Sequence, residues 1–306
     1  MKITALVENK SEGQVIPKHG LSLYIETQKH KLLFDLGPDN TLFNNASAMN
    51  IDLTQVDTVI ISHGHMDHGG ALKRFLQVNT KARIYVQRSA FEPHYSKFLF
   101  LKANVGLDDK LKNNPQIKVI DGDYEIDEEL SLFLVGRRDK CYSEANDALY
   151  NKDGKDDFLH EQNLRIQENK TVIITGCGHT GIVNIMERAS AYKPQVCIGG
   201  FHLCNPLTKK TVPVSLLSSI AQELQKYVGT QFYTCHCTGQ PQYSDLKERT
   251  GVHKRQTRRQ IPVKSNLSRR DKSSYTHPYS FYLLSYHALC GPPVTPRFAW
   301  WCLCCR

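Results

Sequence analysis

The chain has 306 residues, of which 40% are hydrophobic and 23% charged, as expected for a globular protein with a packed core. No stretch approaches the roughly 20 apolar residues of a membrane span, and the apolar start Met1–Glu8 is too short for a secretory signal, so we expect a cytoplasmic protein with no membrane partner. The net charge of +9 lies in one region, because residues 252–306 hold ten Lys and Arg and one acid, which leaves 29 basic and 29 acidic residues in residues 1–251. A neutral body argues against a single basic surface for nucleic acid.

Short apolar runs predict several strands in the first part of the chain. They fall at residues 3–7, 22–26, 31–34, 83–86 and 117–120. The continuous apolar run Asp57–Ser62 (DTVIIS) predicts a further strand that is buried on both faces. After it, apolar residues recur at helical spacing and predict a helix over residues 70–78.

The second part of the body continues this alternation after an irregular segment. Residues 136–162 are polar and without period, which predicts a long loop of the kind that often carries function. Strands are predicted at residues 130–135, 171–175, 196–198 and 231–234, and helices at 182–192 and 214–227. Strands mixed with helices predict an α/β layered fold.

The strongest motif follows the DTVIIS run and reads His63-Gly64-His65-Met66-Asp67-His68. Its three imidazoles and one carboxylate are ligands that suit a divalent metal. A buried strand that ends in a glycine-containing turn delivers such side chains to the end of a sheet, where α/β folds keep their sites. The alternative, a merely polar loop, would leave several buried imidazoles without partners. The segment therefore predicts a metal site.

This H-x-H-x-D-H pattern resembles the signature of the metallo-β-lactamase superfamily. Four further segments resemble other parts of the superfamily's site: Phe34–Gly37, Gly176–Ile182, Gly199–Leu203 and Thr234–Gly239. Together with His19-Gly20 and the Asp156–Gln162 segment, they resemble one branch. It is the branch named after the dihydropterin–ribofuranosylaminobenzene phosphate synthase of methanopterin synthesis. The resemblance covers a domain of residues 1–251 and then stops.

The resemblance implies an αββα sandwich, in which two mixed sheets lie face to face with helices outside. It also implies a site for two divalent metal ions, with zinc expected first and manganese or iron as alternatives. One ion would be bound by His63, His65 and His179, and the other by Asp67, His68 and His236.

Two residues of these segments stand apart from the six ligands that the resemblance implies. The superfamily often bridges its metals with an aspartate at the end of a later strand, where this chain reads Gly-Gly-Phe-His-Leu. His202 of that segment is then either a metal ligand or a contact to substrate. Asp35 is expected to order the site without binding metal itself.

Other histidines and cysteines near these segments have plainer interpretations. His19 lies in a polar loop and is as easily a solvated residue as a site residue. The pattern requires no thiolate, so we expect reduced, small packing residues at Cys177, Cys235 and Cys237. Ordinary polar roles are expected for His30, His94 and His160.

The expected chemistry is hydrolysis. Two divalent ions about 3.5–4 Å apart share a water and lower its pKa toward 7, so a metal-bound hydroxide attacks the substrate and no serine or cysteine nucleophile is needed. Asp67 and His202 are the candidate catalytic side chains, although Asp67 is more simply a ligand. Because the Gly178–Gly181 turn opens a helix, its N–H groups are expected to receive a phosphate. This favours a small phosphoester or a nucleotide-like substrate.

Two other functions remain open at this point. The branch name suggests a transferase, in which a pterin methylene diphosphate loses diphosphate to an aromatic carbon. The basic residues after 251 suggest a nucleic-acid-binding protein or a nuclease. The neutral body ranks this second alternative last, and the oligomeric state is left open.

Residues 252–306 differ in kind from the body. They contain both tryptophans and four cysteines, and no apolar period persists across them. We therefore expect a basic, disordered tail. The abrupt change in composition is also what translation in another reading frame would produce, so a genuine basic arm and an out-of-frame segment both remain open.

Overall fold

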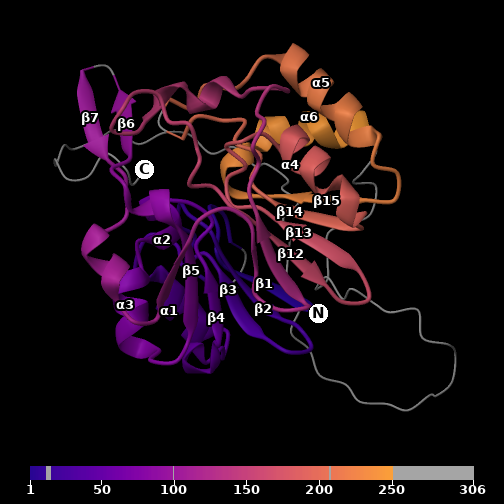
Figure 1. Ribbon diagram of the computed structural model, residues 1–306. Helices are drawn as coiled ribbons and strands as arrows, with labels where there is room; N and C mark the ends of the chain where they lie inside the picture. Colours follow the sequence, from indigo (N-terminus) through magenta and orange to yellow (C-terminus); the bar gives the residue numbers. More distant parts are fainter. Residues whose placement is uncertain (12–14, 99, 207, 251–306) are drawn as a thin grey trace, which may run out of the picture.

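Two sheets packed face to face form the centre of the computed structural model, which describes residues 1–11, 15–98, 100–206 and 208–250. Helices cover the outer face of each sheet, so that the layers run helix, sheet, sheet, helix (Figure 1). This arrangement is the αββα sandwich that the resemblance implies. No helix in these ranges is long and apolar enough to cross a membrane.

The first sheet comes from the N-terminal part of the chain and has the order β1-β2-β3-β4-β5-β8. β1, β2 and β3 pair antiparallel, and β3, β4, β5 and β8 pair parallel. The strands are β1 (Lys2–Val7), β2 (Ser22–Glu26), β3 (Lys31–Phe34), β4 (Thr58–Ile60), β5 (Arg83–Gln87) and β8 (Ile117–Ile120). The helices that follow in this half are α1 (Thr41–Ala48), α2 (Met66–Gly69) and α3 (Leu72–Val78).

The second sheet has the order β15-β14-β13-β12-β10-β9. Its β13, β14 and β15 pair parallel, whereas β9, β10, β12 and β13 pair antiparallel. The strands are β9 (Tyr124–Glu125), β10 (Leu130–Phe133), β12 (Asn163–Gln167), β13 (Thr171–Ile174), β14 (Val196–Gly199) and β15 (Gln231–Thr234). The outer face is covered by α4 (Ile182–Ala189), α5 (Val214–Gln225) and α6 (Gln240–Thr250).

Strand periodicity explains why the central strands are apolar throughout. In β3, Leu32 and Phe34 face the cluster between the two sheets, while Leu33 faces the cluster under α1 and α3. In β13, Val172 and Ile174 face the sandwich interior, while Ile173 lies under the helices of the second sheet. Alternate side chains thus enter different clusters, and both must be apolar.

The parallel strands determine where the site lies. β3, β4, β13, β14 and β15 run in parallel groups, so their carboxyl ends meet along one edge of the sandwich. Each of these strands ends within one of the predicted segments or is followed by one within a few residues: Phe34–Gly37, His63–His68, Gly176–Ile182, Gly199–Leu203 and Thr234–Gly239. Loops that come from different parts of the chain therefore converge at this edge, as α/β folds commonly arrange them.

Most predicted elements are confirmed, and several were missed. The missed helices are α1, α2 and α6. The missed strands are β9, β12 and those of a small third sheet, β6 (Tyr95–Phe98), β7 (Leu101–Asn104) and β11 (Leu149–Tyr150). The predicted loop over 136–162 contains β11 and a short 3-10 helix at Glu144–Ala148. The predicted tail, residues 252–306, lies outside the described residues.

Candidate metal centre

The predicted ligand turn joins β4 to α2 at the converging edge. His63, His65 and His68 are at most 5% exposed, whereas the side chain of Asp67 is 22% exposed. Three imidazoles in the turn are thus withdrawn from water, where a polar ring atom without a partner is destabilising.

His63, His65 and His179 form what we call the first triad. One ring nitrogen of each lies within 4.8 Å of the others. The Nε2 atom of each ring is buried and has no hydrogen-bond partner. Burial lowers the pKa of all three imidazoles well below its ordinary value, so the rings are neutral. Three neutral nitrogens that lack protein partners are what a divalent ion would satisfy.

The opposite ring nitrogens show which way the lone pairs point. His179 Nδ1 donates to Asn146 Oδ1 at 2.8 Å. Ser62 Oγ donates its one proton to Asp35 Oδ2 at 2.7 Å and therefore accepts from His63 Nδ1 at 2.8 Å. Because Nδ1 carries the proton in both rings, the Nε2 lone pairs face the centre of the triad. Metal-binding histidines are commonly oriented by such contacts.

Asp67, His68 and His236 form the second triad. The Nε2 atoms of His68 and His236 lie 3.2 Å apart. Asp67 Oδ2 lies 3.3 Å from His236 Nε2 and 3.7 Å from His68 Nε2. Ligands about 2.0–2.1 Å from a tetrahedral ion lie roughly 3.3 Å from each other. The second triad therefore also fits a metal ion.

The buried Asp35 and the half-buried Asn9 orient the rings of the second triad. Asp35 Oδ2 accepts from His68 Nδ1 at 2.6 Å, and Asn9 Oδ1 accepts from His236 Nδ1 at 2.9 Å. Burial opposes a charge on His68, but Asp35 and Asp67 outweigh it and raise the pKa of His68 to about 9. An ion in this triad must displace that proton, which couples metal binding to proton release.

His202 and His19 lie at the two sides of the centre. His202, after β14, is 4% exposed, and both of its ring nitrogens are buried without a partner. Its ring centroid lies 4.1 Å from that of His179, so it belongs to the surroundings of the first triad. His19 Nε2 lies 3.4 Å from Asp67 Oδ2, and the side chain of His19 is 36% exposed. The structure therefore places His19 at the rim and His202 inside.

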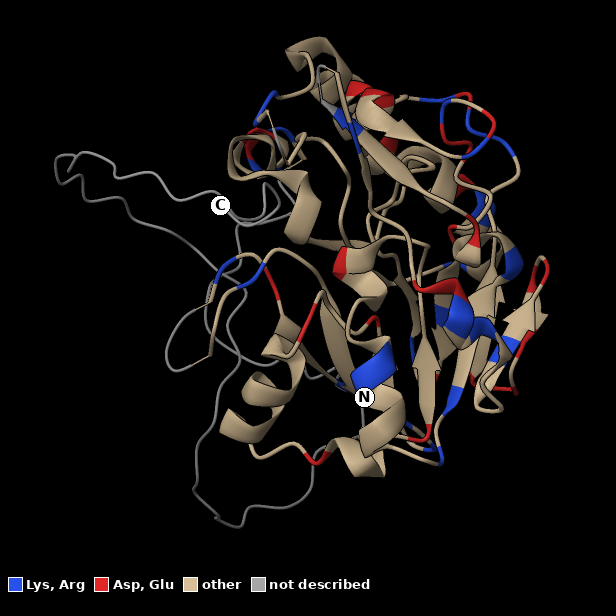
Figure 2. Cartoon of the chain, turned by 90° about the vertical axis from the view of Figure 1, so that its left-hand side faces the viewer, with Lys and Arg blue, Asp and Glu red and all other residues tan. Residues whose placement is uncertain are grey.

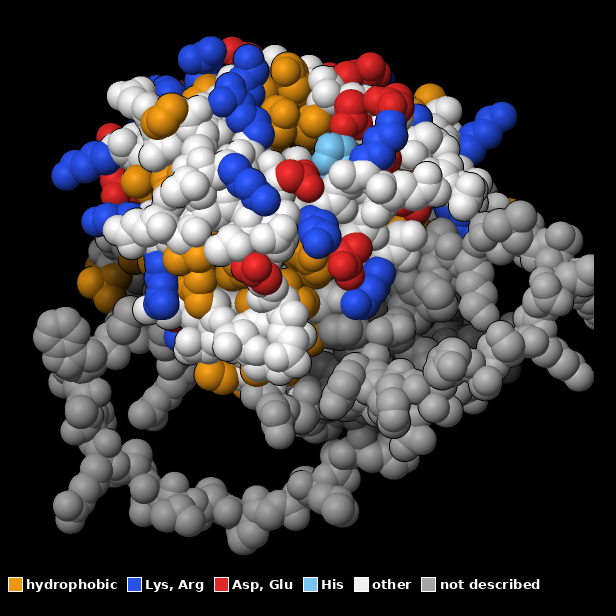
Figure 3. All heavy atoms as spheres, turned by 90° about the horizontal axis from the view of Figure 1, so that it is seen from below, with side chains coloured by type: hydrophobic (Ala, Val, Ile, Leu, Met, Phe, Trp, Pro, Cys, Tyr) orange, Lys and Arg blue, Asp and Glu red, His pale blue; other side chains and the backbone are white. Residues whose placement is uncertain are grey.

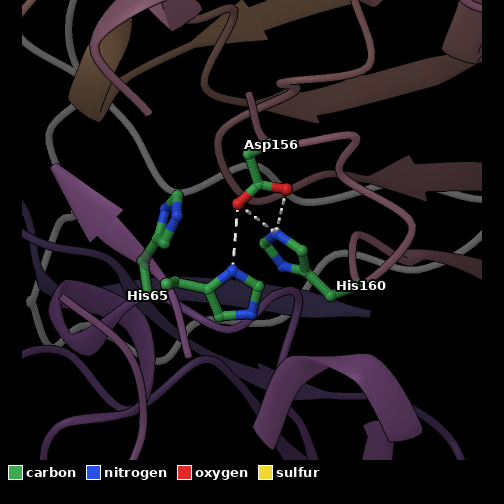
Figure 4. Close-up of side chains that lie close together, drawn as sticks. His65, Asp156 and His160 are labelled. Carbon is green, nitrogen blue, oxygen red and sulfur yellow. Dashed lines mark hydrogen bonds and ion pairs between the residues drawn. The ribbon is translucent and has the colours of Figure 1, made fainter. Parts of the chain in front are cut away.

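The plain polar roles expected for His94 and His160 are wrong, because both are buried beside the ligand turn. Gly64 N–H donates to His160 Nδ1 at 2.9 Å, so His160 Nε2 carries the proton that faces Asp156 at 3.2 Å. His94 Nδ1 lies 2.9 Å from the same carboxylate. Figure 4 shows Asp156 and His160 joined in this way, with the ring of His65 alongside. His94, Asp156 and His160 thus form a buried cluster that holds the backbone of Gly64, between the ligands His63 and His65.

Glu161 holds the other ligand turn. Its carboxylate is buried and accepts from His179 N at 2.7 Å, from Thr180 N at 2.8 Å and from Thr180 Oγ1 at 2.7 Å. The expectation that the Gly178–Gly181 turn receives a phosphate is therefore wrong for these two N–H groups, since an internal anion already occupies them. The turn is positioned by the protein's own carboxylate.

The segment from Asp156 to Gln162, which we call the strap, thus contacts both ligand-bearing turns. Besides the contacts above, Phe158 stacks on the ring of His179 with centroids 4.6 Å apart and an angle of 3°. Gln162 N donates to Ser62 O at 2.7 Å. The sequence pattern of this segment carried the resemblance, but no role followed from it. Only the fold shows that the strap connects the turn that holds His63 with the turn that holds His179.

Comparisons with known proteins agree with this geometry. Residues 15–183 match the family model described as "Metallo-beta-lactamase superfamily". A solved structure of Tm1679, described as a metal-dependent hydrolase of the beta-lactamase superfamily, is 27% identical with a TM-score of 0.68, and the match covers 82% of this chain and 93% of that one.

Two relatives come from Methanocaldococcus jannaschii. Uncharacterized protein MJ0448 is 26% identical over 245 residues, which is 78% of this chain and 90% of that protein. The enzyme named 7,8-dihydropterin-6-methyl-4-(beta-D-ribofuranosyl)-aminobenzene-5'-phosphate synthase is 27% identical over 248 residues, which is 72% of this chain and 81% of that protein. These matches extend over most of the described residues.

Proposed function

The chain belongs to the metallo-beta-lactamase superfamily, and from this premise we propose that it is a metal-dependent hydrolase with a two-metal centre that cleaves a small phosphoester or nucleotide-like substrate. The observation that carries the proposal is the buried Nε2 atoms of the first triad, which have no partner in the protein. They lie beside a second triad whose spacings suit a tetrahedral ion. Zinc is the first candidate for these nitrogen and oxygen ligands.

The proposed roles follow from where each side chain lies. The six residues of the two triads hold the ions, and Asp35, Asn146 and Asn9 keep the rings turned toward them. Divalent ions bound here would polarise a substrate oxygen and bring the pKa of a bound water toward 7. His202, with both ring nitrogens unpartnered, would contact the substrate or hold a proton for its leaving group.

The charge of the ligand set supports an anionic substrate. Five of the six triad residues are histidines, and the only carboxylate among them is Asp67. Two divalent ions would therefore leave a positive centre in a buried setting, where an anionic oxygen is favoured. On the face that Figure 3 shows, Lys and Arg are interspersed with Asp and Glu, and Figure 2 shows both kinds spread along the chain. This face does not favour one sign of ligand, so the support for an anionic substrate comes from the centre itself.

A synthase is the second candidate, because the relative named as the dihydropterin synthase shares 27% identity over 248 residues. In that case the same centre would stabilise a leaving group during transfer to carbon. Release of free diphosphate without ester hydrolysis would favour this candidate. Ester hydrolysis without an acceptor would favour the hydrolase.

The test is a substrate panel on protein that has been stripped by a chelator and reloaded with zinc, manganese or iron. Phosphodiesters, phosphomonoesters and thioesters are assayed at equal concentration, with His63→Ala as the matched inactive control. We expect at least one phosphoester class to be hydrolysed only after reloading. No turnover of any phosphoester by protein with full metal content would overturn the substrate assignment, and turnover of thioesters alone would redirect it.

A further inference from the structure

A buried thiol lies between the two triads. Cys177 follows β13 and is 3% exposed. Its Sγ lies within 4.8 Å of a ring nitrogen of His63 and of His68, and, in a separate group, of His179 and His202. It also groups with His236 and Cys237. Cys177 is therefore close to rings of both triads at once, although the sequence alone indicated a packing residue.

The distances match those between ligands that share an ion. Cys177 Sγ lies 3.2 Å from His68 Nε2, the same separation as between the Nε2 atoms of His68 and His236. A thiolate at about 2.3 Å and an imidazole at about 2.0 Å from a tetrahedral ion lie roughly 3.5 Å apart. The thiol thus stands at the distance of a further ligand to the second triad.

On the other side, the first triad presents unpartnered atoms toward the same region. His63 Nε2 and His179 Nε2 are buried without a hydrogen-bond partner, on residues that are 0% and 4% exposed. These atoms are independent of the cysteine and need a ligand of their own. Cys177 Sγ lies within 4.8 Å of a ring nitrogen of each of these two residues, so the sulfur borders the first triad as well as the second.

The two glycines at the end of β14 have no room for a side chain. A Cβ atom on Gly199 would lie 2.1 Å from Thr175 O, and one on Gly200 would lie 2.5 Å from Cys237 Sγ and 2.8 Å from Gly176 O. An aspartate at either position would displace backbone atoms. Gly199 and Gly200 therefore cannot carry a bridging carboxylate while the Cys177 turn packs this closely against the strand end.

We propose that Cys177 is a metal ligand whose thiolate bridges the first and second triads. As the sulfur–metal bonds form, the S–H bond breaks and the proton leaves to solvent, so that no oxidant or reductant is involved. Cys237 has a different part, because its Sγ donates to the carbonyl oxygen of Cys177 at 3.4 Å and so positions the turn. The inference rests on the proposed metal centre.

The test uses the full chain loaded with cobalt(II) in place of its metal. A cobalt–thiolate bond produces a charge-transfer absorption in the near ultraviolet that nitrogen and oxygen ligands do not produce. We expect this band in the wild-type protein and its loss in Cys177→Ala and Cys177→Ser. The matched control is Cys197→Ala, which removes a fully buried thiol from the apolar core under the helices and should keep the band.

Metal content separates the possible failures. We expect Cys177→Ala to hold at least one ion tenfold or more weakly in competition with a chelator, since a ligand has been removed, while its circular dichroism stays native. If the wild-type protein binds no divalent ion, the metal centre itself is refuted. If it binds two ions but lacks the band, or if Cys177→Ser keeps both the band and wild-type affinity, the thiolate assignment is overturned.

Discussion

The two triads reach similar geometry by different means. In the first triad three neutral imidazoles present Nε2 atoms that no protein group satisfies. In the second triad a carboxylate and two imidazoles contact each other at 3.2–3.7 Å, and Asp35 and Asp67 outweigh burial and raise the pKa of His68 to about 9. The first triad is thus incomplete without an ion, whereas the second is complete in a protonated form. A site can be prepared for metal either by leaving atoms unsatisfied or by holding a displaceable proton.

Loss of a ligand from the first triad should have the largest effect. His63→Ala or His65→Ala removes one of only three nitrogens, so we expect the protein to lose one ion and activity to fall at least 100-fold, the upper end of what even indirect contacts to a metal change. Elemental analysis and turnover are measured on the same sample. A variant that retained two ions and full activity would show that the unsatisfied nitrogens have another purpose.

The second triad is tested by Asp67→Asn. If Asp67 is a ligand, the amide weakens binding at this triad and turnover falls with metal content, because a neutral oxygen replaces a charged one. We expect excess metal to restore part of the activity. Unchanged stoichiometry and affinity with lost activity would instead make Asp67 a catalytic base and end the symmetry between the triads.

The strap should matter to the first triad more than to the second. Glu161→Gln places an NH₂ group or a weaker acceptor against the buried N–H groups of His179 and Thr180, which now donate to a carboxylate. We expect a 10- to 100-fold loss of affinity for one ion, as for other residues that orient a ligand. The control is Glu128→Gln, whose side chain is 73% exposed. Equal affinities in a chelator competition would contradict the role of the strap.

The smallest effect is expected at His30, which pairs with Asp57 at 2.9 Å and with Asp127 at 2.7 Å outside both triads. Burial opposes its charge, but the two carboxylates outweigh it and raise the pKa of His30. Because the pKa of His30 is higher in the folded than in the unfolded protein, its charged form stabilises the fold. This contribution is fully present below the unfolded pKa and is lost as the pH rises through the folded pKa. We expect His30→Gln to reduce the free energy of unfolding by roughly 0.5–1 kcal/mol near pH 6 and much less near pH 9.

Urea unfolding of metal-free protein at both pH values measures this difference directly. A loss that is equal at pH 6 and pH 9 would show that the pairing contributes packing and not charge. The result also bears on the second triad, because it measures how much carboxylates stabilise a charged imidazole at a position away from the metal ligands. His68 is paired with carboxylates in the same way.

The sequence was informative where chemistry is concentrated in a few neighbouring residues. The turn from His63 to His68 could be recognised because its ligands are close in sequence and follow a buried strand. The αββα architecture followed from the resemblance, and the apolar strands that both clusters require are visible as continuous runs. Local pattern and fold agreed at these positions.

What the sequence did not show depends on contacts between distant segments. Asn146 and Asn9 orient ligands that are 33 and 227 residues away, and nothing in their own surroundings in the sequence distinguishes them from other loop residues. α1 was missed because polar residues such as Asn45 are buried in it, and that side chain donates to Leu6 O and Ile16 O across the fold. Such contacts appear only once the chain has folded.

The most direct test of the account is a metal titration of wild-type protein that has been stripped completely by a chelator. We predict that two divalent ions bind per chain, that protons are released as the second triad fills, and that activity is absent before the ions are added and present after. Full activity in the stripped protein, or no binding of zinc, manganese, iron or cobalt, would contradict the central claim that these two triads form a metal centre.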